Sequence, residues 1–160
     1  MEESPSEKQL RQRLSASRFS AEGFLGEDNR SIDEIINEDT GTLERSAVSH
    51  EQLVTALKEV YGRAREALGA EITLKQGVAA RYYESMGKIP SPYRGDGVFE
   101  KGEVIVRNAD GSRRIIITSL GIALIEKHGF FQGKGSRYRI EPSTAIDLLE
   151  VKPYSTKRQS

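Results

Sequence analysis

The sequence predicts a single α+β domain over residues 19–151. Its antiparallel sheet of about four or five strands, from 71 to 140, would be covered by helices at 49–68 and 119–128. Three observations predict this class. Apolar residues recur at helical spacing in some segments and alternate in others. An Asp-Gly pair at 110–111 separates two alternating segments, which is a hairpin signal. Leucine, isoleucine, valine and phenylalanine make up 38 of 160 residues, enough for a folded core.

The N-terminal part predicts an arm followed by short helices. Residues 1–18 are polar, and we expect a flexible arm there. Ser31 and Glu34 have the capping-box spacing, in which each side chain satisfies a backbone donor of the other. We expect this helix to span about 32–37 and to stop near Gly41, with one more turn after it.

The clearest helix signal begins at Ser49, which forms a second capping-box pattern with Gln52. Gly69 lies where a C-terminal glycine is expected. Between them, apolar residues at spacings of three and four form one stripe, made of Leu53, Leu57, Val60 or Tyr61, Ala64 and Leu68. Gly62 costs about 1 kcal/mol relative to alanine inside a helix, which indicates close packing at that position.

Beyond that helix the period changes to two. Residues 72–74 and 78–82 alternate around a turn at 75–77, which favours a hairpin, and a helix from about 76 to 86 is the alternative. Residues 87–97 hold two prolines and three glycines, so we expect no regular structure there.

The strongest hairpin signal covers residues 103–118. If Asp110 and Gly111 are the two loop residues of a type I′ turn, the register of the strands is fixed. It pairs Val106 with Ile115, Val104 with Ile117, Ile105 with Ile116 and Arg107 with Arg114. The first two pairs share one face, which we assign to the core.

The C-terminal third predicts two more helices and a strand. Ser119 can cap a helix that runs through His128 to a closing glycine. Residues 137–140 are expected to form a further strand, and Pro142 can open the last helix. Residues 152–160 would be a flexible tail.

The formal net charge is zero, with 24 basic and 24 acidic residues, yet the charges are unevenly placed. Residues 1–74 hold 15 acids and 9 bases, whereas residues 75–139 hold 6 acids and 12 bases. Either the two segments neutralise each other, or the acidic helical half docks a protein partner or a second copy of the chain.

The composition also excludes several classes. With no cysteine, the chain has no disulfide framework, thiolate metal site or thiol catalysis. No motif for a cofactor or a metal is present, so we expect neither. The N-terminus does not have the pattern of a secretory signal, and the longest apolar run is too short to cross a bilayer. These features predict a soluble, cytoplasmic protein without a membrane partner.

The hairpin register places Arg107 across from Arg114, and facing like charges are unfavourable unless something intervenes. An anion held by both guanidinium groups is one solution. The alternative is that the side chains splay into water, or that Glu103 or a carboxylate of the acidic segment neutralises them.

The run 129–139 mixes three aromatic residues with Lys134, Arg137 and Arg139. This composition is typical of surfaces that bind single-stranded nucleic acid by stacking and phosphate contacts. In the alternative interpretation the aromatic residues, Phe130, Phe131 and Tyr138, belong to the core. Alternation along the expected strand would place both arginines on one face.

His128 is expected in the last helical turn before a glycine, where it can cap the helix and where the helix dipole favours the imidazolium. It could instead act as a general acid or base, with Asp96 or Arg94 completing a pocket. The spacing does not show whether the fold brings Asp96 to His128.

Three function hypotheses follow. The first is a non-catalytic binding module with a local basic face for an anionic ligand, which includes nucleic acid; its residues would be Arg94, Arg107, Arg114, Lys134, Arg137 and Arg139. The second is an enzyme with a pocket centred on His128. The third is an interaction domain, binding a protein or itself through the acidic half.

The stretch from His128 to Pro142 (HGFFQGKGSRYRIEP), taken with the helix starts at Ser31 and Ser49, resembles a group of small bacterial conserved hypothetical proteins over residues 24–142. The resemblance implies an intact bacterial domain and no mechanism. Many of these similar proteins carry a cysteine where this chain has Ser91, which implies that thiol or metal chemistry is dispensable here.

Overall fold

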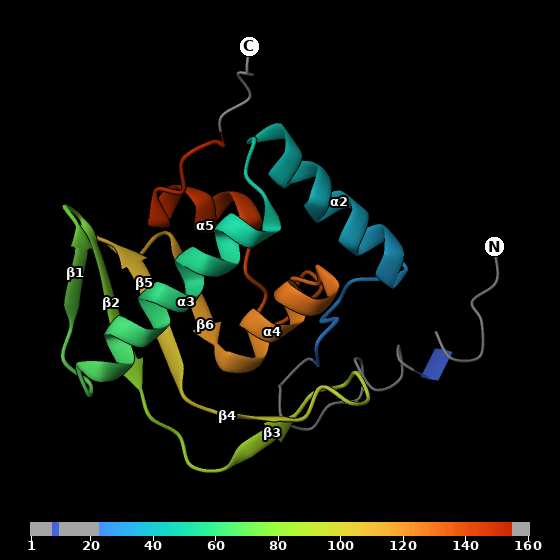
Figure 1. Ribbon diagram of the computed structural model, residues 1–160, viewed down its shortest axis with the longest axis horizontal. Helices are drawn as coiled ribbons and strands as arrows, with labels where there is room; N and C mark the ends of the chain where they lie inside the picture. The colour runs from blue at the N-terminus through green and yellow to red at the C-terminus, as the bar shows by residue number, and fades with distance from the viewer. Residues whose placement is uncertain (1–7, 10–22, 155–160) are drawn as a thin grey trace.

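The computed structural model describes residues 8–9 and 23–154, and within them it has an α+β fold (Figure 1). A four-stranded antiparallel sheet has the order β1-β2-β5-β6, and β3 and β4 form a separate two-stranded hairpin. The expected fold class is therefore confirmed. The strands are β1 (Ile72–Lys75), β2 (Val78–Tyr83), β3 (Lys88–Pro90), β4 (Val98–Glu100), β5 (Glu103–Asn108) and β6 (Arg114–Thr118). The helices are α2 (Ile32–Arg45), α3 (His50–Glu66), α4 (Ser119–His128) and α5 (Pro142–Leu149).

The main core lies between the sheet and the helices, with α3 running across the strands and in contact with β2, β5 and β6 (Figure 1). Alternate residues of the strands are buried against α3, α4 and α5, among them Val78, Ala80, Val104, Val106, Ile115 and Ile117. A second, smaller core joins α2, α4 and the segment before α2, and contains Phe24, Leu25, Ile32, Ile35, Leu120, Leu124 and Phe130. The segment 129–131 thus contributes its aromatic rings to both cores.

The register of the central hairpin is confirmed, whereas its turn type is not. β5 and β6 pair Val106 with Ile115 and Arg107 with Arg114. The Gly111 amide donates to the Asn108 carbonyl at 3.1 Å. Only Gly111 of the two expected loop residues has a positive φ, of 75°. A type I′ turn needs a positive φ at both central positions, so this turn belongs to another type.

Both capping boxes are present, but the first helix is longer than expected. α2 runs without interruption for 14 residues through Gly41, and there is one helix where two short ones were predicted. Burial of Leu43, which is 1 % exposed, offsets the helix cost of that glycine. α3 begins at its Ser49 cap and ends at Glu66, slightly earlier than predicted. A Cβ at Gly62 would meet nothing within 4 Å, so the expectation of close packing there is wrong.

One further expectation is confirmed and two need correction. Residues 76–86 form strand β2 and its flanks, so the hairpin holds and the helical alternative does not. Residues 88–90 form β3 inside the stretch expected to be irregular, because Pro90 lies at the end of a short two-stranded hairpin and needs no ladder donor there. Residues 137–140 form no strand; a turn there is closed by the Arg139 amide on the Ser136 carbonyl.

Thr118, not Ser119, caps α4, since its hydroxyl accepts from the Gly121 amide at 2.9 Å. The expected arm, 1–18, lies outside the described residues apart from 8–9, and so does the expected tail beyond residue 154. Within the described part, no helix combines the length and apolar character needed to cross a membrane.

Candidate functional site

The structure brings together two residues that the sequence could not place side by side. Nε2 of His128, at the end of α4, lies 2.8 Å from Oδ2 of Asp96, in the loop between β3 and β4. The two residues are 32 positions apart in the chain. This couple satisfies the geometric condition on which the His128 hypothesis depended.

Local structure holds each partner in place. α4 ends at Gly129, whose φ of 65° and amide bond to the Ile125 carbonyl close the helix directly after His128. On the other side, the Ser91 amide donates to the Gly97 carbonyl at 3.0 Å and closes the loop that carries Asp96. A glycine at 97, with φ of 89°, provides the backbone conformation that this closure needs.

Tyr93 is the third member of the site. Its ring stacks on the His128 ring, with centroids 3.6 Å apart and an interplanar angle of 11°, and it meets Phe130 edge-on at 6.5 Å. Burial, with the nearby charges of Asp96 and Asp33, raises the pKa of Tyr93 to about 12. Tyr93 therefore stays a neutral phenol that packs the imidazole from one side.

The hydrogen bond from His128 lowers the pKa of Asp96 below its ordinary value, and Lys127 and Ser91 act in the same direction. The Ser91 hydroxyl lies 3.4 Å from the same carboxylate oxygen that His128 uses. Ser91 thus lies on the Asp96 side of the couple. A nucleophilic serine would need to lie on the histidine side, so these three residues do not form a Ser-His-Asp triad.

The outer side of the couple is open. The His128 side chain is 26 % exposed and that of Asp96 is 13 % exposed. Nδ1 of His128 has no hydrogen-bond partner among the residues that the structure describes, and it is not shielded from solvent. Arg94 and Lys127 are exposed next to the couple in sequence. The arrangement can therefore accept or donate one proton or one hydrogen bond at Nδ1.

The expected basic face is largely occupied by carboxylates. Arg107 does lie across from Arg114, but it forms an ion pair with Glu71 at 2.7 Å. Arg137 binds Glu103 at 2.9 Å, so the neutralisation considered as the alternative does occur. Arg114 is exposed without an ion pair in the described part of the chain.

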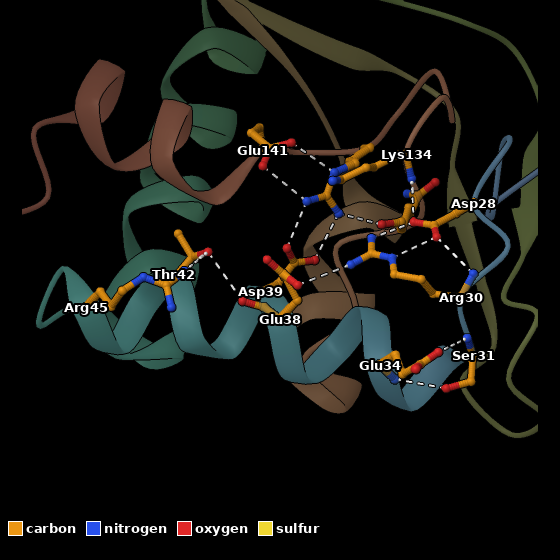
Figure 2. A network of polar contacts seen from close by, with 12 residues as sticks. Asp28, Arg30, Ser31, Glu34, Glu38, Asp39, Thr42, Arg45, Lys134 and Glu141 are labelled. Atoms are coloured by element: carbon orange, nitrogen blue, oxygen red, sulfur yellow. Dashed lines mark hydrogen bonds and ion pairs between the residues drawn. The ribbon is translucent and has the colours of Figure 1, made fainter. Parts of the chain in front are cut away.

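Arg139 belongs to a buried network rather than to an open face, and Figure 2 labels its carboxylate partners Asp39 and Glu141. Its guanidinium group, only 7 % exposed, binds both oxygens of Asp39 at 2.8–2.9 Å and also Glu141. Burial acts against this charge, but the bonds to Asp39 and Glu141 raise the pKa of Arg139 further above its ordinary value. The expected shared face of Arg137 and Arg139 depended on a strand that does not form.

A second ion pair continues the network. Arg30 binds Asp28 with two nitrogens, at 2.8 and 2.6 Å, and this contact lowers the pKa of the Asp28 carboxyl well below its ordinary value (Figure 2). The Lys134 amide donates to Asp28 at 3.0 Å, whereas the Lys134 side chain is exposed. Lys134 thus fixes the segment before α2 through its backbone and leaves its charge outside.

Ion pairs join the two charged segments in both directions. In two of them the acid comes from 1–74, and in two it comes from 75–139; the pairs are Glu71 with Arg107, Asp39 with Arg139, Glu100 with Arg65 and Glu126 with Lys58. The segments therefore contact and partly neutralise each other, as the first of the two interpretations of the charge distribution required.

Sequence reasoning missed Tyr93, because nothing in a glycine- and proline-rich loop shows which ring will reach a distant helix. A signal was available in part, since Tyr93 is three positions from Asp96 in the same short loop.

In the described residues no group of three or more His, Asp or Glu side chains is placed to hold a metal ion. No family model, curated protein or solved structure matches this chain. The resemblance to small bacterial proteins stays a prediction.

Proposed function

We propose that the protein is a non-catalytic, cytoplasmic binding module that holds a phosphate-like anionic group beside His128. The observation that carries this proposal is the 2.8 Å contact between Nε2 of His128 and Asp96. Asp96 fixes the orientation of the ring and balances one charge, so that a protonated ring has its Nδ1–H left to donate to a ligand. Tyr93, stacked on the ring, keeps it from rotating away.

The charges around the couple favour an anion. Arg94 lies two positions from Asp96 in the same loop, and Lys127 directly precedes His128; both are exposed. Two acids, Asp96 and Asp33, lie nearby, and Asp96 is already engaged with the histidine. Three basic groups, counting His128 itself, therefore belong to the couple or adjoin it in sequence, against two acids of which one is committed to the histidine.

The test is calorimetric titration of the full chain with inorganic phosphate and, separately, with a thymidine oligonucleotide. Each charge-assisted hydrogen bond contributes about 1.5–3 kcal/mol, so His128→Gln and Arg94→Gln should each weaken binding about tenfold or more. His50→Gln and Arg63→Gln are matched controls on α3 and should leave binding unchanged. The proposal would be refuted if His128→Gln bound each of the two probes as tightly as the parent chain does.

The two probes separate two sources of the same phosphate chemistry. If the ligand is free phosphate or a small phosphorylated molecule, the oligonucleotide should bind no more tightly, per phosphate group, than inorganic phosphate does. If it is single-stranded nucleic acid, oligonucleotide affinity exceeds that of phosphate and falls steeply with salt. Arg114→Gln then adds a second test of the facing-arginine hypothesis, because Arg114 lies on the sheet and not beside His128.

General acid–base catalysis is the second candidate function, and the same couple favours it. When Nε2 carries the proton that it donates to Asp96, Nδ1 presents a basic lone pair. In this case Asp96→Asn would lower the turnover of an activated ester while leaving ligand binding almost intact. If the parent chain hydrolyses the ester no faster than His128→Gln does, this second function is excluded.

A further inference from the structure

A cavity of about 180 Å³ lies between the β3–β4 hairpin and the main sheet. Ile89 of β3 lines it, together with Thr118 at the end of β6, Leu120 in the first turn of α4, and Phe24. α4 has ten residues and is about 15 Å long, so the cavity and His128 lie at opposite ends of this helix. The cavity is therefore distinct from the proposed anion site.

Gln132 is the most informative residue of its wall. It is 3 % exposed, and its φ of 75° is a conformation that non-glycine residues rarely adopt. Its side-chain oxygen accepts from the Ser136 hydroxyl at 3.0 Å, while its amide nitrogen has no partner among the described residues. The Gln132 amide nitrogen is not shielded from solvent, and a residue with a strained backbone whose amide donors are open beside a cavity is typical of a ligand site.

The other polar groups of the wall are held in place and balanced in charge. The Glu103 carboxylate accepts from Arg137 and from the Tyr138 hydroxyl, both at 2.9 Å, and keeps lone pairs that a ligand can use. Glu100, on the hairpin side, forms an ion pair with Arg65 at 2.8 Å. Each carboxylate of the wall thus has its own arginine.

The Thr118 hydroxyl accepts from the helix and still has its proton to donate. The wall therefore offers donors at Gln132 and Thr118 and acceptors at Glu103, next to apolar surface from Phe24 and Leu120. A hydroxyl group both donates and accepts, so several hydroxyl groups on a small carbon frame match this mixture.

We infer that this cavity binds a small, neutral, polyhydroxylated molecule of about the size of a monosaccharide or a cyclitol. Paired charges in the wall favour a neutral ligand. A charged ligand would need an opposite charge in the wall, whereas the arginines and glutamates there are paired with each other. Lys101 also lines the cavity, so a small anion is the competing class. The volume lies below the roughly 300–1,000 Å³ of pockets for drug-sized ligands.

The experiment follows backbone and side-chain amide signals of the full chain by NMR, during titration with glucose, myo-inositol, acetate and ethylammonium. We expect saturable shifts of the Gln132 side-chain amide and the Leu120 amide with glucose or myo-inositol. No saturable shift with either polyol would overturn the inference, and so would stronger binding of acetate or ethylammonium.

Two variants localise the effect. Ile89→Trp fills the cavity from the hairpin and should abolish the shifts, whereas Val98→Trp is the matched control, because Val98 is 59 % exposed on the same hairpin and does not line the cavity. Gln132→Glu keeps the oxygen that accepts from Ser136 and removes the amide donors, so it should weaken binding at least tenfold. If Ile89→Trp fails to fold, the result with Gln132→Glu decides. Unchanged binding in that variant would contradict the inference.

Discussion

Replacing Arg139 by methionine should be among the most destabilising single changes in the described part of this protein. The Arg139 side chain is 7 % exposed and that of Asp39 is 2 % exposed, and two hydrogen bonds of 2.8–2.9 Å join them. Methionine keeps much of the apolar stem but removes the charge, so it leaves the Asp39 carboxylate buried without its principal partner.

The expected loss follows from that burial. Breaking a buried ion pair by removing one partner costs about 3–5 kcal/mol. Arg30, whose charge also acts in this network, is engaged with Asp28 and compensates for only part of the loss. We therefore expect a decrease of about 3 kcal/mol in the free energy of unfolding, which corresponds to about 6–12 °C in Tm for a chain of this length.

Urea unfolding followed by circular dichroism measures this loss. Arg137→Met is the matched control, because the Arg137 side chain is 46 % exposed in its pair with Glu103 and such a pair contributes about 0–1 kcal/mol. The double variant Asp39→Leu, Arg139→Met removes both charges and should recover much of the stability. A loss below about 1 kcal/mol for Arg139→Met, or an equal loss for Arg137→Met, would refute the reasoning.

Three other predictions concern stability. Gly26→Ala should lower the free energy of unfolding by more than about 2 kcal/mol, since φ is +59° and a Cβ would lie 2.3 Å from a backbone nitrogen. Gly69→Ala, with open space around it, should lower it by less in the same urea assay. Gly62→Ala should stabilise α3 by about 0.8 kcal/mol, and a loss of stability would show a contact that the structure lacks. Arg30 lowers the pKa of the Asp28 carboxyl from 3.8. The contribution of this ion pair to the free energy of unfolding is therefore present above about pH 4 and is lost as the pH falls toward the lowered pKa. The deficit of Arg30→Met should therefore shrink between about pH 6 and about pH 2–3, and a constant deficit would contradict this assignment.

The sequence predicted the parts of the fold that depend on local chemistry. Capping boxes at Ser31 and Ser49 located two helix starts, and the alternation around 110–111 fixed the strand register. The turn type was wrong although the register was right. The register depends on which residues face the core, and more than one turn can connect the same pairs.

The predictions of secondary structure were wrong where contacts between distant segments determine the local structure. Gly41 is typical of a helix end, yet burial of Leu43, two residues further, continues α2 through it. Residues 137–140 alternate like a strand, but Arg139 is drawn into the ion pair with Asp39, 100 positions away. Sequence spacing contains no information on such a partner, so a basic residue of the expected open face became part of the interior.

The candidate site was half predictable for the same reason. His128 before a glycine, and Asp96 in a tight loop, each have a local signal. Their 2.8 Å contact depends on how the β3–β4 hairpin packs against α4, which only the fold determines. The stacking of Tyr93 on His128 has only the partial signal of its nearness to Asp96 in the sequence, and the cavity beside Gln132 has none, since both arise where separate segments meet.

The most direct test of the anion site is nitrogen NMR of the histidine rings during titration with inorganic phosphate. The chain has two histidines, so His50→Gln assigns both sets of signals. The anion site predicts a saturable shift of Nδ1 of His128, with Nε2 held by Asp96 throughout and His50 unaffected. A His128 ring whose nitrogen signals do not respond to phosphate, or which respond no more than those of His50, would contradict it.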